Sequence, residues 1–421
     1  MDKKIKVFTL GDHPLSPSGV GTQSRYVIEA LLETGNFKVV SFGGAISHKK
    51  HDPVKTEQWE DDWIIYPVDG YGTQDAVRSV VRTEKPDIIW IMTDPRFWTW
   101  FWEIAHELRS LAPIVYYHVW DNYPYPRFNQ AYYESNDVMV SISKLTDDII
   151  KNVAPSVWLE HIPHSIDTEI FKRATEEEVK TFRKASLSNE KNPNRTIFFW
   201  NNRNARRKQS GTLIWWFKEF LDEVGHDEAM LLMHTDVNDP NGQDLEAIIN
   251  RLGLTDGEVM FSTAKVPPHN LSAIYNMVDC TINISDAEGF GLATLESLAC
   301  GTPIIVNMTG GLQEQVTDGE EWFGVGLQPA SRAIIGSQDV PYIYEDRLNK
   351  DDFIQALKKM HSMTREERRK LGKKGRNHVM QNYNYVQFKE KWVGLMTKVY
   401  ETCGSWGNRK NYKSWEFKEI K

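Results

Sequence analysis

Cysteine and long apolar runs are both scarce in this sequence. Three cysteines occur among 421 residues, Cys280, Cys300 and Cys403, and none has CxxC or other metal-ligand spacing. Such usage suits a reducing compartment and argues against a zinc site. No window reaches the roughly 18 apolar residues of a membrane-spanning helix. We therefore expect no transmembrane segment and a cytoplasmic location, or an intracellular product of a virus.

An excess of positive charge is also missing. Lysine and arginine number 50 against 58 aspartates and glutamates, which gives a net charge of -8. This charge argues against a general nucleic-acid-binding surface, although it does not exclude a local basic groove. The hydrophobic share of 40% and the 15 tryptophans provide ample core material. The length favours two domains.

Strand-like apolar runs alternate with helical segments along both halves of the chain. This alternation predicts parallel sheets covered by helices, in two doubly wound halves. The polar stretch 172–195 is the expected boundary between the halves. The expected strands are IKVFTL, FKVVSFG, DIIWIM, PIVYYHV and DVMVSIS in the first half, then TIFFWNN, AMLLMHT, EVMFST, CTINIS and TPIIVN in the second.

The stretch DAEGFGLATLESLACGTP (286–303) combines a glycine turn with two acids. A strand before it and a helix after it would aim free N–H groups and the positive end of the helix dipole at one point, which favours an anion. Glu288 is out of place there unless it faces sugar hydroxyls, for which a carboxylate is a strong acceptor. The alternative is that Glu288 is a helix N-terminal acid and Glu296 a solvated helix residue.

Other strand ends also carry glycines or cations. Gly19 and Gly21 precede a helix, but the GxGxxG fingerprint is incomplete and no acid ends the second strand, which counts against an NAD-dependent dehydrogenase. Arg203 and Lys208 follow the first strand of the second half, where they could neutralise a diphosphate. A basic surface turn is the alternative for this pair.

A histidine and an aspartate, His118 and Asp121, end the run PIVYYHVWDN. A satisfied core histidine is the alternative to a functional one. The turn MTGGLQEQV adds Gly310, Gly311 and Glu314 after a further strand. Because ligands of doubly wound sheets bind beyond the carboxyl ends of the strands, these turns predict a cleft for a nucleoside diphosphate attached to a hydroxyl-rich group.

At this point the chain resembles a known family. EGFGLATLE, followed by SLACGTPIIV and GGLQEQV, is similar to the paired-glutamate signature of family 4 retaining glycosyltransferases with the GT-B fold. SGVG, NRNARRK, ISKLTDDI, IPHSIDTEIF and GKKGRNHVMQNYNY resemble further landmarks in the expected order, and the resemblance spans residues 5 to about 400.

The resemblance implies an α/β fold of two doubly wound Rossmann-like domains that face each other across a cleft. Residues 1–172 would form the acceptor-side domain and 173–384 the nucleotide-sugar-binding domain. The C-terminal helix, about 385–421, would pack back on the first domain.

The resemblance also implies roles for single residues. Glu288 would contact the donor sugar hydroxyls, Glu296 the nucleotide ribose, and Arg203 and Lys208 the diphosphate. His118 would lie near the reacting sugar, which places it with Glu288, Arg203 and Lys208 in the catalytic set. The remaining donor-binding positions would be Gly289, Phe290, Gly291 and Leu292 in the second half, with Gly19 and Gly21 approaching from the first half.

The implied reaction is transfer of a sugar from a nucleoside diphosphate sugar, UDP or GDP above all, to an acceptor hydroxyl with retention of configuration. No metal or other cofactor and no dedicated general base are expected, since the leaving phosphate would help to take the acceptor proton. The rivals are a GT-B nucleotide-sugar epimerase, a GT-B phosphorylase and a non-catalytic GT-B scaffold. Glycan, lipid, protein, small molecule and modified DNA base all stay open as acceptors, and a homodimer is one option for assembly.

Three motifs depart from the family pattern. IPHSID places His164 and Ser165 where Asn and Gly are usual, NNR replaces GR before the basic pair, and MHTDVND lacks a common glycine. These changes lie around the expected donor site without deleting a charged group. We therefore expect activity with an altered donor preference.

The segment DPRFWTWFWEIAHEL (94–108) is unusually aromatic. Asp94 and Pro95 predict the start of one helix. Its core stripe would be Phe97, Trp100, Phe101 and Ile104. Trp98 and Trp102 would lie on another flank and contact the acceptor or a second subunit, with Asp121, Tyr123, Tyr125 and Phe128 extending that surface. A second buried face is the alternative for the two tryptophans.

Overall fold

The structure, a computed structural model, describes residues 3–187 and 192–413 and divides the chain into two compact units. The first unit is Met1–Ser165, Gly336–Ile343 and Tyr385–Lys421, and the second is Ile166–Ile335 and Tyr344–Asn384. The sequence predicts a domain boundary between residues 172 and 173, and the first boundary between the two units lies between Ser165 and Ile166. Residues 188–191 of the expected boundary region and 414–421 of the expected C-terminal helix lie outside the described residues.

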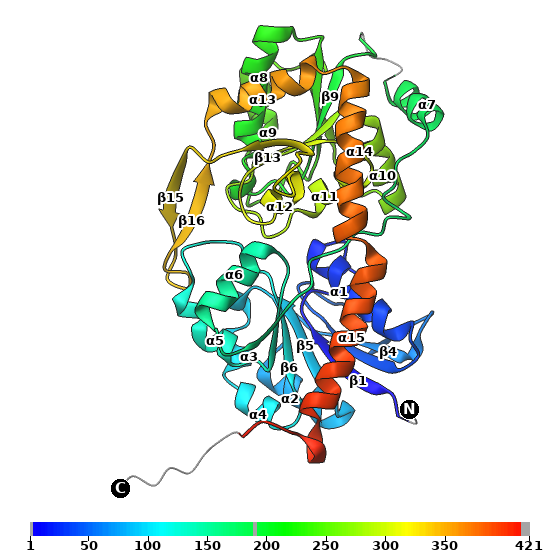
Figure 1. The fold of residues 1–421 in the computed structure, drawn as a ribbon, viewed down its shortest axis with the longest axis vertical. Helices are drawn as coiled ribbons and strands as arrows, with labels where there is room; N and C mark the ends of the chain where they lie inside the picture. The colour runs from blue at the N-terminus through cyan, green and yellow to red at the C-terminus, as the bar shows by residue number, and fades with distance from the viewer. Residues whose placement is uncertain (1–2, 188–191, 414–421) are drawn as a thin grey trace. The chain divides into compact units, whose positions relative to one another are not determined.

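The first unit is built on an eight-stranded sheet (Figure 1) with the order β3-β4-β2-β1-β5-β6-β7-β8. Its neighbouring strands are parallel except for β3, which is antiparallel to β4. The strands are β1 (Ile5–Leu10), β2 (Phe37–Gly43), β3 (Val54–Thr56), β4 (Glu60–Pro67), β5 (Ile88–Thr93), β6 (Ile114–His118), β7 (Val138–Ser141) and β8 (Trp158–His161).

Helices cover both faces of this sheet. The late helix α15 packs against α1 (Figure 1). The rings of Tyr26, on α1, and Tyr385, on α15, lie 4.5 Å apart. The helices are α1 (Gly19–Leu32), α2 (Gln74–Glu84), η1 (Pro95–Phe97), α3 (Thr99–Trp102), α4 (Ala105–Arg109), η2 (Arg127–Asn129), α5 (Gln130–Glu134), α6 (Lys144–Val153), α15 (Tyr385–Cys403) and η4 (Trp406–Asn408).

The second unit is built on a six-stranded parallel sheet with the order β11-β10-β9-β12-β13-β14. Two further strands, β15 and β16, follow each other in the chain and form a separate two-stranded hairpin. The strands are β9 (Thr196–Asn201), β10 (Ala229–His234), β11 (Val259–Ser262), β12 (Cys280–Asn283), β13 (Ile304–Asn307), β14 (Gly324–Leu327), β15 (Ser331–Ile335) and β16 (Ile343–Arg347).

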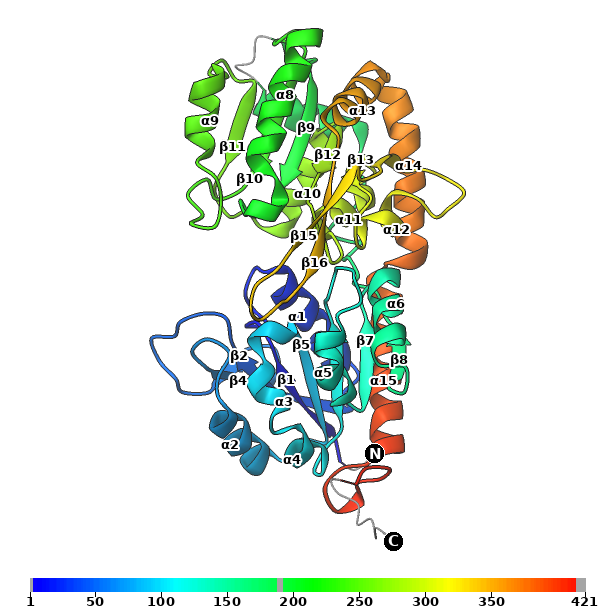
Figure 2. The ribbon, with the colours of Figure 1, turned by 90° about the vertical axis from the view of Figure 1, so that its left-hand side faces the viewer.

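Helices flank the second sheet as well, and Figure 2 shows α8 and α9 against one face of β9, β10 and β11. The helices of this unit are α7 (Glu176–Ser186), η3 (Arg206–Lys208), α8 (Ser210–Val224), α9 (Leu245–Leu252), α10 (Pro268–Met277), α11 (Leu292–Ala299), α12 (Leu312–Val316), α13 (Lys350–Ser362) and α14 (Arg365–Asn382).

All ten strands expected from the sequence are confirmed, and the doubly wound α/β class with them. Most of their side chains are buried, as in β5, where all six residues are buried, whereas Met260 of the edge strand β11 is 40% exposed. Continuous apolar runs of this kind are typical of parallel strands that helices cover on both sides. The sheet topology places the carboxyl ends of β9, β12 and β13 at one edge of the second sheet.

The prediction of one helix over 94–108 is wrong. The segment forms η1, α3 and α4, with breaks at Trp98 and Ile104, so a single 3.6-residue period does not describe its faces. Phe97, expected in the core stripe, is 51% exposed, whereas Trp98 is 0% and Trp102 5% exposed. The two tryptophans therefore belong to the core of the first unit, which is the alternative that the sequence left open.

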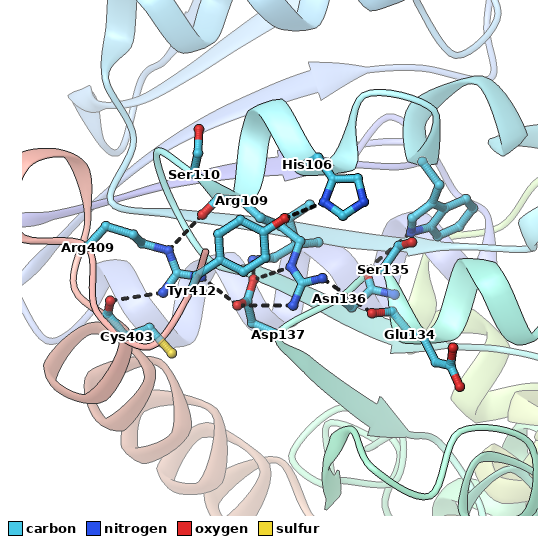
Figure 3. Close-up of polar contacts among 12 residues, drawn as sticks. His106, Arg109, Ser110, Glu134, Ser135, Asn136, Asp137, Cys403, Arg409 and Tyr412 are labelled. Atoms are coloured by element: carbon cyan, nitrogen blue, oxygen red, sulfur yellow. Dashed lines mark hydrogen bonds and ion pairs between the residues drawn. The ribbon is translucent and has the colours of Figure 1, made fainter. Parts of the chain in front are cut away.

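Polar contacts anchor the segment after α15 beside Asp137, the residue that precedes β7 (Figure 3). The Arg409 and Arg109 guanidinium groups both donate to Asp137, with N–O distances of 2.5 and 3.1 Å. Both guanidinium groups also lie over the Tyr412 ring, whose hydroxyl is 2.7 Å from Nδ1 of His106. This cluster ties the C-terminal segment to α4 and the start of β7.

Candidate active site

The glycine turn of DAEGFG is shaped by its neighbours in the second unit. Gly291 has a φ of +91° and is the N-cap of α11, and no side chain among the described residues caps that helix. A side chain at Gly310 would place its Cβ 1.7 Å from the Glu288 carbonyl oxygen, and the Gly311 N–H donates to the same oxygen over 3.1 Å. The two glycines after β13 therefore fix the loop that carries Glu288.

Lys208 and Glu288, expected to serve diphosphate and sugar, form a buried ion pair. Their side chains are 10% and 12% exposed, and Nζ of Lys208 donates to Oε2 of Glu288. Nδ2 of Asn283 donates to the same oxygen over 3.2 Å. Burial alone would raise the pKa of Glu288, but the positive charges of Lys208 and Arg207 lower it to about 2. Glu288 is therefore ionised near neutral pH.

Arg203, the second expected diphosphate ligand, is paired with a different acid. Its guanidinium donates two hydrogen bonds to Asp239, which follows β10, and the Nη2–Oδ1 distance is 3.1 Å. Arg203 is 62% exposed, whereas Asp239 is 8% exposed. The hydrogen bonds from Arg203 lower the pKa of Asp239 to about 2. The sequence did not single out Asp239, although it ends the divergent motif MHTDVND.

Glu296, the second acid of the motif, lies on α11. The Tyr275 hydroxyl donates to its Oε2 over 2.7 Å, and Nδ2 of Asn201 donates to the same hydroxyl over 2.8 Å. Burial raises the pKa of Glu296 to about 7. The alternative of a fully solvated helix residue therefore does not hold for Glu296, which is partly buried and hydrogen-bonded.

The other predicted donor-binding residues of the second unit lie in the same loop or at its end. Phe290 is 3% exposed, its ring lies 5.7 Å from that of Tyr383, and its carbonyl accepts from Gln315 over 2.6 Å. Gly289 and Leu292 are partly buried. Phe290 is thus a packing residue whose side chain holds the loop against the second unit.

Sequence reasoning missed several charged residues beside this loop. Asp286, the first residue of the quoted motif, accepts from Arg347 of β16 and from Gln209, and burial raises its pKa to about 6. Arg206 and Arg207 stand between the two predicted cations, and Arg207 donates to the Ala287 carbonyl. Adjacency to the motifs could have indicated Asp286, Arg206 and Arg207, but no local pattern indicates Arg347.

The glycine pair of the first unit begins α1. Ser18 is the N-cap, accepts from the Gly21 N–H over 3.0 Å and donates to Asp12 over 2.9 Å. A Cβ at Gly21 would lie 2.5 Å from Oγ of Ser16 and 2.8 Å from the His13 carbonyl oxygen. Glycine is therefore required at 21 for the close approach of the preceding loop, and Gly19 is the first residue of the helix.

His118 ends β6 and is fully buried in the first unit. Its Nε2 lies 2.5 Å from the Tyr133 hydroxyl, while its Nδ1 has no hydrogen-bond partner among the described residues. Burial lowers the pKa of His118 to about 3. The imidazole is therefore neutral at physiological pH and suited to hydrogen bonding rather than to acid catalysis.

The loop after His118 carries the remaining predicted acceptor residues. Asp121 and Tyr123 are partly buried. The Tyr123 and Tyr125 hydroxyls both donate to Asp148, over 2.6 and 3.0 Å, and burial raises the pKa of Tyr123. Trp98 and Trp102 differ from them because both are buried core residues, and Nε1 of Trp102 donates to Asn136.

The part of the chain that the structure describes has neither a cluster of metal-ligating side chains nor a membrane-spanning helix. Within 3–187 and 192–413, no group of three or more histidine, cysteine, aspartate or glutamate side chains could hold a metal ion. None of the helices over the same residues is both long and apolar enough to cross a membrane.

Part of the chain is similar in sequence to known glycosyl transferases. Residues 181–378 match the family model described as "Glycosyl transferases group 1". The chain is 42% identical over 90 residues to the D-inositol 3-phosphate glycosyltransferase of Acidothermus cellulolyticus, covering 21% of this chain and 20% of that protein. It is 28% identical over 192 residues to the GDP-mannose-dependent alpha-(1-6)-phosphatidylinositol monomannoside mannosyltransferase of Mycolicibacterium smegmatis, covering 44% and 47%. The matches thus span less than half the length of these relatives.

Solved structures resemble nearly the whole chain. The sucrose-phosphate synthase of Thermosynechococcus elongatus superimposes with a TM-score of 0.74 at 17% identity over 94% of this chain and 100% of that one. HepE of Anabaena in complex with UDP and glucose gives 0.69 at 14% identity over 93% and 99%. The predicted fold is confirmed: the chain has the GT-B fold, and its residues 181–378 resemble the group 1 glycosyl transferases.

Proposed function

We propose that this protein is a glycosyltransferase that moves a sugar from a nucleoside diphosphate sugar to an acceptor hydroxyl, with retention of the anomeric configuration. The observation that carries the proposal is the buried Lys208–Glu288 pair, which stands after β9 and β12 and immediately before the first turn of α11. This arrangement combines a cation, free helix N–H groups and an ionised acceptor of hydroxyl hydrogen bonds.

Each part of a nucleotide sugar has a counterpart in the second unit. Lys208, Arg203 and the N-terminus of α11 would bind the diphosphate, Glu288 the sugar hydroxyls, and Glu296 the ribose. HepE, which shares the fold, is solved with UDP and glucose, and the Mycolicibacterium relative is named as GDP-mannose-dependent. UDP and GDP are therefore the proposed donor nucleotides.

In the proposed reaction the bond between the anomeric carbon and the phosphate oxygen breaks, and the diphosphate leaves with the electron pair. The acceptor oxygen forms the new bond to that carbon, and its proton passes to the leaving phosphate oxygen. Arg203 and Lys208 would neutralise the developing charge, which is the largest electrostatic demand of such a step. No metal and no other cofactor are proposed.

The contributions of the first unit rest on the family resemblance. Gly19 and Gly21 would let its loop approach the diphosphate, and His118 would donate or accept a hydrogen bond near the reacting sugar. The acceptor could be a glycan, lipid, protein, small molecule or modified DNA base. We propose a cytoplasmic location and leave a homodimer as an option for assembly.

A thermal-shift screen of UDP, GDP, ADP and their sugars tests the donor proposal. A ligand at 100 times its Kd stabilises the folded state by about 2.7 kcal/mol through mass action, which raises Tm measurably. Product analysis by NMR would then show the anomeric configuration, and transfer should continue in EDTA. A protein that binds none of these nucleotides, or that forms the inverted product, would contradict the proposal.

A further inference from the structure

Two charged residues of the hairpin β15–β16 contact the loops of the candidate site, although the proposed function does not use them. Glu345 and Arg347 lie on β16, and both reach the loops that carry Lys208 and Glu288. No sequence motif links the hairpin to those loops. Their contacts therefore raise the question of what the hairpin does for the site.

Glu345 is held between two guanidinium groups. Arg206 donates to both of its carboxylate oxygens, with an Nη1–Oε2 distance of 3.0 Å, and Arg347 donates to Oε2 over 2.6 Å. Glu345 is 2% exposed, whereas Arg206 is 61% exposed. A two-pronged arginine–carboxylate contact fixes orientation as well as distance. The buried Glu345 carboxylate therefore fixes the position of the more exposed Arg206 side chain.

Arg347 extends the network to the second loop. Its Nη1 donates to Oδ2 of Asp286 over 2.7 Å, and Nε2 of Gln209 donates to the same oxygen over 2.5 Å. The main chain adds two more links, because the Asp286 N–H donates to the Arg207 carbonyl over 2.8 Å and the Asp346 N–H donates to the Asp286 carbonyl over 2.8 Å. The hairpin therefore touches both the 206–209 turn and residue 286.

The ends of this network lie close in the chain to Lys208 and Glu288. Arg206 is two residues before Lys208, and Asp286 is two residues before Glu288. Fixing these neighbours restricts the backbone from which the Lys208–Glu288 pair projects. Gln209 adds a further constraint, since it is held at a φ of +58°, a conformation that is uncommon for a residue other than glycine.

We propose that Glu345 and Arg347 are positioning residues of the donor site: from β16 they orient Arg206 and Asp286, and so set the geometry of the 206–209 turn and the 286–288 loop for the diphosphate sugar. The proposal rests on the proposed function, because it names the part of the chain that shapes the same donor site. The competing explanation is that these contacts serve only to attach the hairpin.

The test uses the full chain with Glu345→Gln, which keeps the shape and removes the charge. Arg332→Ala is the matched control, because Arg332 lies on the other strand of the same hairpin, is 59% exposed and pairs with Asp346 over 2.8 Å. We expect Glu345→Gln to raise the Kd of UDP or GDP and the donor KM by about tenfold, the size of one charged hydrogen bond, while kcat changes less than threefold. For Arg332→Ala, the Kd, the donor KM and kcat should each stay within about twofold of the wild-type values.

A double-mutant cycle separates positioning from attachment. If Glu345 acts through Arg206, then Arg206→Ala with Glu345→Gln should lose clearly less affinity than the product of the two single losses. Amide hydrogen exchange in 203–209, which needs no ligand, should be faster in Glu345→Gln than in Arg332→Ala. Multiplicative losses, or exchange and Kd equal to the control, would overturn the positioning role while wild-type transfer stands. A wild-type chain that binds neither UDP nor GDP would instead refute the proposed function and this inference with it.

Discussion

Replacing Lys208 by methionine should expose how strongly the buried pair depends on both charges. Methionine keeps much of the volume of the lysine side chain but leaves Glu288, 12% exposed, without its nearest cation. Burial by itself raises the pKa of Glu288, and Lys208 is the first of the charges that lower it to about 2. We therefore expect the Glu288 pKa to rise above its ordinary value of 4.5 in Lys208→Met.

The loss of stability expected in Lys208→Met follows from the same pKa values of Glu288. A fall of the pKa from 4.5 to about 2 corresponds to roughly 3 kcal/mol at about 1.4 kcal/mol for each pKa unit. Removal of one partner of a buried ion pair costs about 3–5 kcal/mol, which agrees. Because the folded-state pKa is depressed, this stabilisation is fully present above pH 4.5 and is lost as the pH falls from 4.5 through 2.

Urea unfolding of wild type, Lys208→Met and the double variant Lys208→Met with Glu288→Gln, at pH 7 and at lower pH, measures this prediction. Lys208→Met should lower the free energy of unfolding by about 3 kcal/mol or more at pH 7. The difference from wild type should shrink as the pH falls through the raised Glu288 pKa of the variant and then from 4.5 through 2. Adding Glu288→Gln to Lys208→Met should recover part of the loss, because no unpaired carboxylate then stays buried. A Lys208→Met protein as stable as wild type, or a double variant less stable than Lys208→Met, would refute the reasoning.

Three further outcomes are expected. Glu288→Gln should lower sugar transfer by about 10²-fold while the protein stays folded, and a folded variant with wild-type turnover would rule out its role at the donor sugar. Asp239→Asn should tighten diphosphate binding several-fold, about the value of one charged hydrogen bond, because Arg203 loses its competing carboxylate; calorimetry with UDP and uridine would show whether the gain depends on the phosphates. Trp98→Ala should cost about 3–5 kcal/mol of stability in thermal or urea unfolding, whereas a surface role in acceptor binding would leave stability unchanged.

The strands and the glycine turns could be read from the sequence because their signals are local. The run CTINIS predicts β12, and Gly291 marks the turn before α11, because buried strands and positive φ angles impose residue types on a few neighbouring positions. The acids of the turn could be singled out for the same reason. The fold class and the position of Glu288 on the second sheet follow from these local patterns.

The partners of the charged residues could not be read in this way. Arg206 and Glu345 are 139 positions apart in the chain, and Glu345 lies in a hairpin whose residues show no motif. The prediction for the aromatic segment 94–108 was wrong for a related reason. Short turns at 95–97 and 104 reorient the chain, so Trp98 is buried where a continuous helix would expose it. Side-chain packing at long range decides both features, and a periodic pattern carries no information about it.

The ion pairs also explain how an acid can stand in a loop suited to anions. Glu288 does not repel a phosphate group as a free carboxylate would, because Lys208 already balances its charge. Binding of a diphosphate to Lys208 would remove that balance and leave the Glu288 carboxylate with its hydrogen bond from Asn283 but without its paired cation, at a cost in free energy. Sugar hydroxyl groups that donate to Glu288 would restore a partner at the same moment. If the proposed donor binds here, the pair would therefore favour the intact nucleotide sugar over a diphosphate alone, since the sugar hydroxyls would bind the carboxylate that the diphosphate releases.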